Sequence, residues 1–100
     1  MQKQENLTQL VGTLRQQLPL LTKRYHVESL GVFGSYVRHE QQPDSDLDIL
    51  VTFREPPSLL KFIEMENYLS DTLGVKIDLV MKDGLKRHIG QRILREVVAI

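Results

Sequence analysis

Two apolar, strand-like runs with a polar segment between them constrain this chain more than any other feature. The runs cover residues 27–33 and 47–53, and the second is almost continuously apolar, as expected of a buried strand. A Gly-Ser pair follows the first run directly, and Asp46 and Asp48 lie at the start of the second. Because side chains two residues apart in a strand point to one face, both carboxylates should project from the same face of a sheet.

Apolar residues at helical spacing predict three longer helices. The first should cover residues 5–18, with Pro19 kinking or ending it and a further helical turn up to Tyr25. The second should begin after Pro-Pro-Ser at 56–58 and stop at Gly74, and the third closes the chain. The apolar stripes are Leu7, Leu10, Val11, Leu14 and Leu18 in the first helix, Leu59, Phe62, Ile63, Leu69 and Leu73 in the second, and Ile89, Ile93, Val97 and Ile100 in the last.

The remaining segments complete an α/β or α+β arrangement. A short helix is expected around residues 35–39, a polar turn at 40–45 and a third strand at 75–81. In that third strand Asp78 faces away from the more apolar side. The order of helices and strands predicts a single domain, residues 1–100, with a small sheet flanked by helices.

The composition excludes several classes of protein. Lys and Arg balance Asp and Glu at 13 each, so no overall positive charge favours nucleic acid or an anionic membrane. The absence of cysteine excludes disulfides and Cys-based zinc sites and is compatible with the cytoplasm. No apolar run approaches the ~20 residues of a membrane span, and the start MQKQEN is too polar for a signal peptide. We therefore expect a cytoplasmic protein without direct nucleic-acid or membrane binding.

Asp46, Asp48 and Asp78 form the candidate catalytic and metal-binding set. Two divalent ions about 3.5–4 Å apart can neutralise a triphosphate, and Mg²⁺ prefers carboxylate, water and phosphate oxygens as ligands. Two carboxylates ~5 Å apart repel by roughly 3 kcal/mol at an effective dielectric near 20, and bound metal would remove that repulsion. Asp78 would be a third ligand or the general base. The alternative places the Asp-x-Asp pair on the solvated face of an edge strand, but the nearby Gly-Ser pair and the third acid argue against it.

Gly34 and Ser35 are the candidate phosphate-binding residues. A helix that starts at this point offers free backbone N–H groups to a phosphate. Arg38, one turn later, either reaches the triphosphate or pairs with Asp44, and both alternatives stay open. The phosphate loop GxxxxGK[ST] and the dinucleotide motif GxGxxG are absent, and the three histidines lack metal-ligand spacing.

Gly34-Ser35, ten intervening residues and Asp46-x-Asp48 resemble the signature of the DNA polymerase β-like nucleotidyltransferase superfamily. The short length and the segments FGSYVR and SDLDILV are similar to its minimal nucleotidyltransferase branch, the partner of HEPN-domain toxins. The resemblance covers residues 27–100 and implies an α+β fold with a mixed sheet flanked by helices. It also implies transfer of a nucleoside monophosphate from an NTP to a hydroxyl, with release of pyrophosphate.

Carried over by position, the resemblance implies that Gly34 and Ser35 contact the triphosphate, that Asp46 and Asp48 bind Mg²⁺, and that Asp78 completes the triad. Within the minimal branch it implies adenylylation, with ATP, of a hydroxyl on a HEPN-type toxin, typically a tyrosine. The protein would then be the antitoxin of a type VII-like toxin–antitoxin pair. Larger relatives hold the acceptor with a second domain that this chain lacks, so the acceptor must come from another protein.

Two functions therefore stay open at this point. One is a Mg²⁺-dependent enzyme that uses ATP, and the other is a non-catalytic binding module that neutralises its toxin by occlusion. The complete aspartate triad favours the enzyme. Apolar helix surfaces would suit either a homo- or a hetero-oligomer, and no residue identifies the base of the nucleotide.

Overall fold

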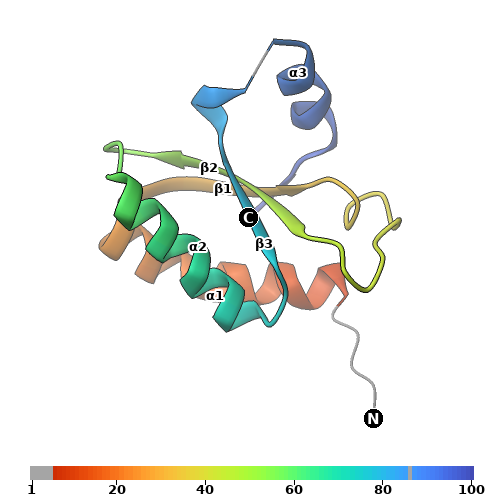
Figure 1. Cartoon of the computed structure of the whole chain (residues 1–100), viewed down its shortest axis with the longest axis horizontal. Coiled ribbons are helices and arrows are strands. Elements are labelled where there is room, and N and C mark those ends of the chain that lie inside the picture. Colours follow the sequence, from red (N-terminus) through yellow and green to blue (C-terminus); the bar gives the residue numbers. More distant parts are fainter. Residues whose placement is uncertain (1–5, 86) are drawn as a thin grey trace.

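The computed structural model of the protein describes residues 6–85 and 87–100. Within these residues, no helix has both the length and the apolar character that crossing a membrane requires. The ranges predicted for the first two strands are confirmed. In chain order the elements are α1 (Leu7–Tyr25), β1 (Val27–Phe33), β2 (Leu47–Phe53), α2 (Leu59–Leu73), β3 (Ile77–Met81), the 3₁₀ turn η1 (Lys82–Gly84), α3 (Arg87–Glu96) and β4 (Val98–Ala99) (Figure 1).

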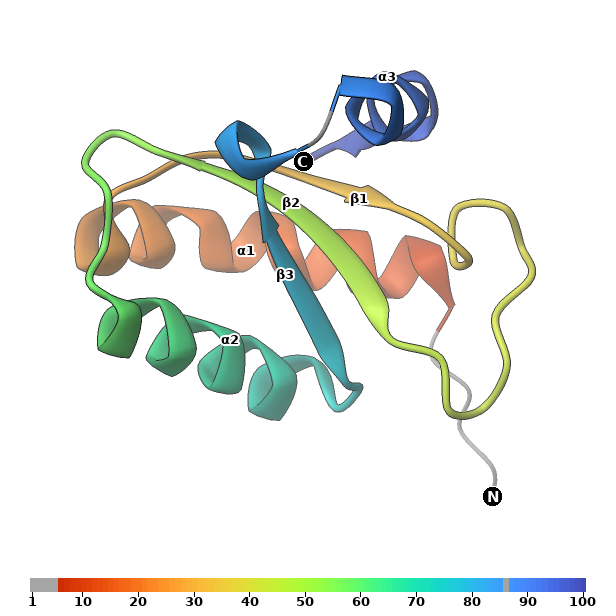
Figure 2. The ribbon, with the colours of Figure 1, turned by 45° about the horizontal axis from the view of Figure 1, so that its top comes forward.

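A four-stranded mixed sheet in the order β3-β2-β1-β4 forms the centre of the fold. β1 pairs antiparallel with β2 and with β4, whereas β2 and β3 are parallel, because α2 connects them as a crossover. Helices α1 and α2 cover one face of the sheet, and α3 lies on the other side (Figure 2). The predicted α+β class with a small mixed sheet is therefore confirmed.

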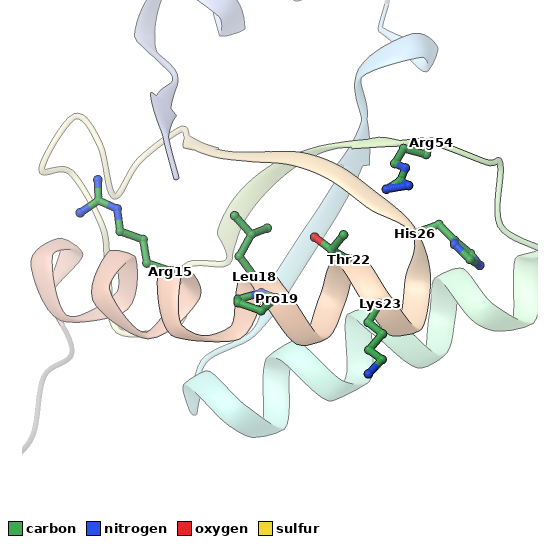
Figure 3. A pocket seen from close by; sticks show the side chains of 7 residues that line it. All are labelled: Arg15, Leu18, Pro19, Thr22, Lys23, His26 and Arg54. Carbon is green, nitrogen blue, oxygen red and sulfur yellow. The ribbon is translucent and has the colours of Figure 1, made fainter.

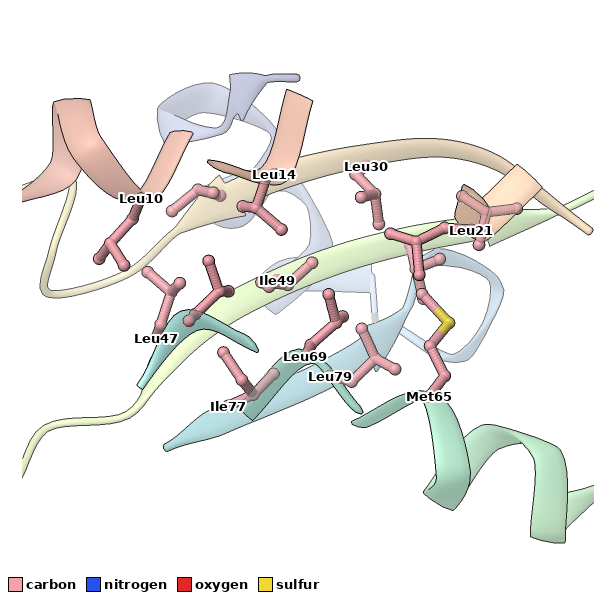
Figure 4. Close-up of a cluster of buried hydrophobic side chains, with 14 of the residues drawn as sticks. Leu10, Leu14, Leu21, Leu30, Leu47, Ile49, Met65, Leu69, Ile77 and Leu79 are labelled. Carbon is pink, nitrogen blue, oxygen red and sulfur yellow. The ribbon is translucent and has the colours of Figure 1, made fainter. Parts of the chain in front are cut away.

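Most of the core lies between the sheet and the two helices α1 and α2 (Figure 4). Both helices begin at a capping side chain, since the Asn6 and Ser58 oxygens accept hydrogen bonds from backbone N–H groups three residues later. Apolar side chains at helical spacing then point to the sheet. Those with less than 2% exposure include Leu10, Leu14 and Leu21 of α1, Met65 and Leu69 of α2, and Leu47 and Ile49 of β2.

The side chains of β2 and β3 alternate between the two faces of the sheet, and this alternation positions the aspartates. Leu47 and Ile49 are fully buried under α1 and α2, so Asp48 between them points to the α3 side. Asp78 occupies the corresponding place between two buried residues of β3. A smaller apolar cluster also fills this second face, formed by Phe33, Leu50 and Ile93.

Helix α1 continues through Pro19, which the sequence predicted to kink or end it, and reaches Tyr25 as one element. Proline cannot donate a hydrogen bond to the carbonyl of Arg15, so one bond of the helical ladder is missing. Leu14 and Leu21 are fully buried on either side of this point. Their packing holds the two halves of the helix in line.

Two other predicted helical features are wrong. Residues 35–39 form a turn instead of a short helix, closed by hydrogen bonds from the Val37 and Arg38 N–H groups to the Gly34 carbonyl. On α2, Leu59 and Ile63 are 73% and 42% exposed, because the sheet-facing side of the helix is set by Met65, Leu69 and Leu73.

The end of the chain also differs from the prediction of one closing helix. α3 ends at Glu96, and β4 then pairs with β1, so Val97 and Ile100 are not helical. Gly31 permits this pairing, since a Cβ there would lie 2.5 Å from a methyl carbon of Val97. The side chain of Ile89, also placed on the predicted stripe, lies outside the described ones.

Candidate active site

Gly34 follows the last residue of β1 and lies directly beside the carboxylate of Asp48. Phe33 is the register partner of Asp48, so the next residue comes close to the Asp48 side chain. A Cβ on Gly34 would collide with the carboxylate, at 2.9 Å from its carbon and nearer still to one oxygen. The φ of 86° is also unfavourable for any residue with a side chain. Glycine is therefore required at this position both by the backbone and by the neighbouring acid.

Asp48 and Asp78 are register partners across the parallel strands β2 and β3, so their side chains stand next to each other on the α3 face. The pKa of Asp48 is raised from 3.8 to about 6, and burial of the carboxyl group is the largest cause. The charge of Asp78, hydrogen bonding with Asp78 and the charge of Asp46 also contribute to this rise, while the charge of Arg38 opposes it. The carboxylates of Asp78 and Asp46 thus both act on the protonation of Asp48, and Asp46 itself is exposed just before β2.

The three aspartates supply the kind of ligand that Mg²⁺ prefers, and a divalent cation would offset the repulsion that raises the pKa of Asp48. Within residues 6–85 and 87–100, however, no group of three or more His, Cys, Asp or Glu side chains is already arranged to hold a metal ion. The donor set fits the metal, whereas its final coordination geometry is not preformed. The metal-binding role of Asp46, Asp48 and Asp78 stays a prediction.

The predicted phosphate-binding residues lie on the other side of Asp48. Ser35 is half-buried at the start of the 35–39 turn. The guanidinium of Arg38 donates to Glu40 at 3.1 Å and to both oxygens of Glu96 at 3.1 Å. The predicted alternative of a pair with Asp44 is not formed.

Glu96, the last residue of α3, makes contacts at this site that the sequence did not predict. Its carboxylate accepts a hydrogen bond from the Gly34 N–H at 2.7 Å in addition to those from Arg38. The two partners are 62 and 58 residues away in sequence, so no local pattern predicts the contact. One signal was available, because an acid in the last turn of a helix opposes the helix dipole and favours a nearby cation.

These residues surround a cavity of about 250 Å³ between the sheet and α3. Of the predicted site residues it brings together Gly34, Arg38 and Asp48, whereas Ser35, Asp46 and Asp78 are not part of its lining. Arg92, one turn before Glu96 on α3, lines it as well. Its full lining is Phe33, Gly34, Arg38, Asp48, Arg92, Ile93 and Glu96.

A larger cavity of about 690 Å³ lies beside α1, toward the opposite ends of β1 and β2 (Figure 3). It is lined by basic, apolar and hydroxyl side chains and by no carboxylate, so it offers no acidic metal ligand. The smaller cavity beside Asp48 is therefore the candidate active site. The larger one is lined by Arg15, Leu18, Pro19, Thr22, Lys23, His26 and Arg54.

Comparison with known proteins gives consistent matches over nearly the whole chain. The profile of the nucleotidyltransferase domain family matches residues 14–100. The protein adenylyltransferase MntA of Thermococcus cleftensis is 59% identical over 80 residues, which are 80% of this chain and 81% of the relative. A solved structure assigned as a minimal nucleotidyltransferase has a TM-score of 0.81 at 33% identity, over 99% of this chain and 100% of that one.

A structure with lower sequence identity is similar to this chain in fold alone. It is a complex of tri-AMPylated Shewanella oneidensis HEPN toxin with MNT antitoxin. The TM-score is 0.59 at 20% identity, over 92% of this chain and 66% of the matched one.

Proposed function

This chain belongs to the nucleotidyltransferase domain family, and on that premise we propose that it transfers AMP from ATP to a hydroxyl of a HEPN-type toxin. The acceptor is a tyrosine, and the modification silences the toxin, so the protein acts as its antitoxin. The paired carboxylates of Asp48 and Asp78 beside Gly34 and Arg38 carry this proposal. Asp48, Gly34 and Arg38 line one cavity, and Asp78 is the register partner of Asp48, which supports an acidic side and a triphosphate-binding side of one site.

The reaction needs an in-line displacement at phosphorus. The oxygen of the acceptor hydroxyl attacks the α-phosphorus of ATP, the bond to pyrophosphate breaks, and the hydroxyl proton passes to a carboxylate. Asp78 is the proposed proton acceptor or third metal ligand. Asp46 and Asp48 would hold Mg²⁺, which when bound neutralises the charge of the triphosphate.

The opposite side of the cavity orients the triphosphate. The Gly34 N–H and the Ser35 hydroxyl are hydrogen-bond donors at the end of β1, and Arg38 supplies a planar cationic donor that suits phosphate oxygens. Arg92 adds a second positive charge from α3. Together these groups hold the α-phosphate next to the carboxylates, where the acceptor hydroxyl has to arrive.

Two relatives support a protein as the acceptor. The Thermococcus cleftensis relative is a protein adenylyltransferase, and the toxin in the Shewanella oneidensis complex carries AMP groups. The exposed apolar residues Leu59, Leu60 and Ile63 at the start of α2 are further support, since a partner would cover such a surface.

The direct test is to mix the purified protein with its genomic-neighbour toxin, Mg²⁺ and each NTP, and to measure intact masses. We expect the toxin to gain mass in units of AMP only with ATP and divalent metal. The double variant Asp46→Asn/Asp48→Asn should bind the toxin without modifying or silencing it. Asp44→Asn, which removes an exposed acid from the same loop, is the matched control and should retain transfer.

The same experiment separates the enzyme from the binding module. If the double variant neutralises the toxin as well as wild type at equal concentration, catalysis is dispensable and occlusion explains the inhibition. If no NTP gives a mass increase with wild type, the proposed transfer reaction is wrong.

A further inference from the structure

The carboxylate of Glu96 occupies the hydrogen-bond donors that a triphosphate would use. It accepts a bond of 2.7 Å from the Gly34 N–H and bonds of 3.1 Å from Arg38 to each of its two oxygens. This is the pattern by which backbone amides and guanidinium groups bind a phosphate oxygen. The Glu96 side chain is 25% exposed, so solvent reaches it and can replace its contacts.

Glu96 and a phosphate cannot use the Gly34 N–H at the same time. A backbone N–H is a single donor, and the space on the Asp48 side of Gly34 is already filled by the Asp48 carboxylate. Both carboxylates also belong to the lining of the same cavity of about 250 Å³. An anion that enters the cavity therefore meets one negative charge on the metal side and another on the phosphate side.

The fold fixes Glu96 in this position from two directions. α3 packs on the sheet through Ile93, and β4 pairs with Gly31 and Val32 of β1 immediately after the helix ends. The Val97 N–H donates to the Ile93 carbonyl, so the junction between α3 and β4 is itself hydrogen-bonded. Glu96 thus stands at a defined point beside Gly34.

We propose that Glu96 is a built-in competitor of the triphosphate, which must displace its carboxylate from Gly34 and Arg38 before the nucleotide can bind. This inference rests on the proposed function and adds control of the same site. A singly or doubly charged anion that displaces the Glu96 carboxylate only exchanges one negative charge for another, so its net binding free energy is small. A triphosphate carries additional charge for Arg92, so Glu96 makes the site selective for polyphosphates.

Calorimetric titration with inorganic tripolyphosphate tests the competition without catalysis. Glu96→Gln keeps the size and an acceptor oxygen for Gly34 but removes the charge that pairs with Arg38. We expect it to bind tripolyphosphate about tenfold more tightly than wild type, because a charge-assisted contact no longer has to be broken. Glu28→Gln removes an exposed acid from β1 and should leave the affinity unchanged.

A second measurement on wild-type protein needs no variant. Titration with tripolyphosphate, followed by NMR, should shift the Gly34 amide and the Glu96 side-chain carboxyl carbon together as the contact breaks. The inference is wrong if Glu96→Gln binds tripolyphosphate no more tightly than wild type. It is also wrong if the Glu96 signal stays constant while wild type binds. Either result leaves the proposed function untouched. If tripolyphosphate binds neither protein, the proposed triphosphate site and the inference are both wrong.

Discussion

Asp48 of β2 lies directly opposite Asp78 of β3 in the parallel ladder, and the pKa of Asp48 is raised to about 6 by burial and by the neighbouring acids. The fold therefore keeps two carboxylates together against their mutual repulsion. An ionisable group with a strongly shifted pKa that lines a cavity, as Asp48 does, is a candidate for a chemical role. Its effect on the free energy of unfolding can be measured.

The first prediction concerns pH and stability in the absence of divalent metal. Because the folded pKa of Asp48 lies above its ordinary 3.8, its contribution is fully favourable below that value and is lost as pH rises through about 6. Asp48→Asn should be more stable than wild type at pH 7.5 by about 1 kcal/mol, a value reduced because the side chain is partly exposed. The gain should disappear below pH 4. Urea unfolding at both pH values, with Asp44→Asn as control, measures it.

The second prediction concerns metal removal. Protein treated with EDTA should bind Mg²⁺ or Mn²⁺ in the micromolar to millimolar range and unfold at a higher temperature when either ion is added. At ten times the Kd the stability gain is about 1.4 kcal/mol. Asp48→Asn should lose most of this gain, and Asp44→Asn should keep it. An equal thermal shift in wild type, Asp46→Asn and Asp48→Asn would remove these aspartates from the metal site.

The third prediction uses two glycines with positive φ. Gly34→Ala places a Cβ against the Asp48 carboxylate, whereas Gly74→Ala meets no atom within 4 Å. Both variants suffer backbone strain of about 1 kcal/mol, at φ values of 86° and 73°, and only Gly34→Ala adds a collision. We expect transfer to be lost in Gly34→Ala and retained in Gly74→Ala. Equal activity in the two would show that close approach at Gly34 is not needed.

The fourth prediction separates two arginines of α3. Arg92 lines the cavity beside Asp48 and Arg95 does not. Arg92→Gln should lower kcat/KM for ATP about tenfold, as expected for one lost charge-assisted contact of about 1.4 kcal/mol. Arg95→Gln should change it less than about twofold. A similar effect of both variants would indicate a general charge effect of α3 on ATP.

Local sequence patterns correctly predicted the segments whose structure depends on neighbouring residues in the sequence. Residues 27–33 and 47–53 read as strands and have those bounds in the structure, and Ser58 and Gly74 cap α2 as expected. The alternation of side chains in β3 correctly predicted that Asp78 faces away from the apolar core. Each of these features depends on side-chain period or on a single capping residue.

Features that depend on tertiary contacts were not predictable in this way. Helix α1 stays continuous at Pro19 because its side chains pack on the sheet. The pairing of β4 with β1 depends on the space that Gly31 leaves for Val97. The contact of Glu96 with Gly34 joins residues that are 62 positions apart in the sequence. In the sequence, Glu96 is only one acid within a closing segment that is rich in Lys and Arg.

Strand β2 has a hydrogen-bonded neighbour on each side, with Asp48 opposite Phe33 on one and Asp78 on the other. Its amides should be among the slowest in the protein to exchange with deuterium, since they open only when the sheet does. α3 is attached through one small apolar cluster and the two-residue strand β4, so it should exchange at a lower opening free energy. The wall of the cavity that carries Asp48 should therefore outlast the wall formed by α3 in local opening, so the aspartate can keep its place while the helix exchanges.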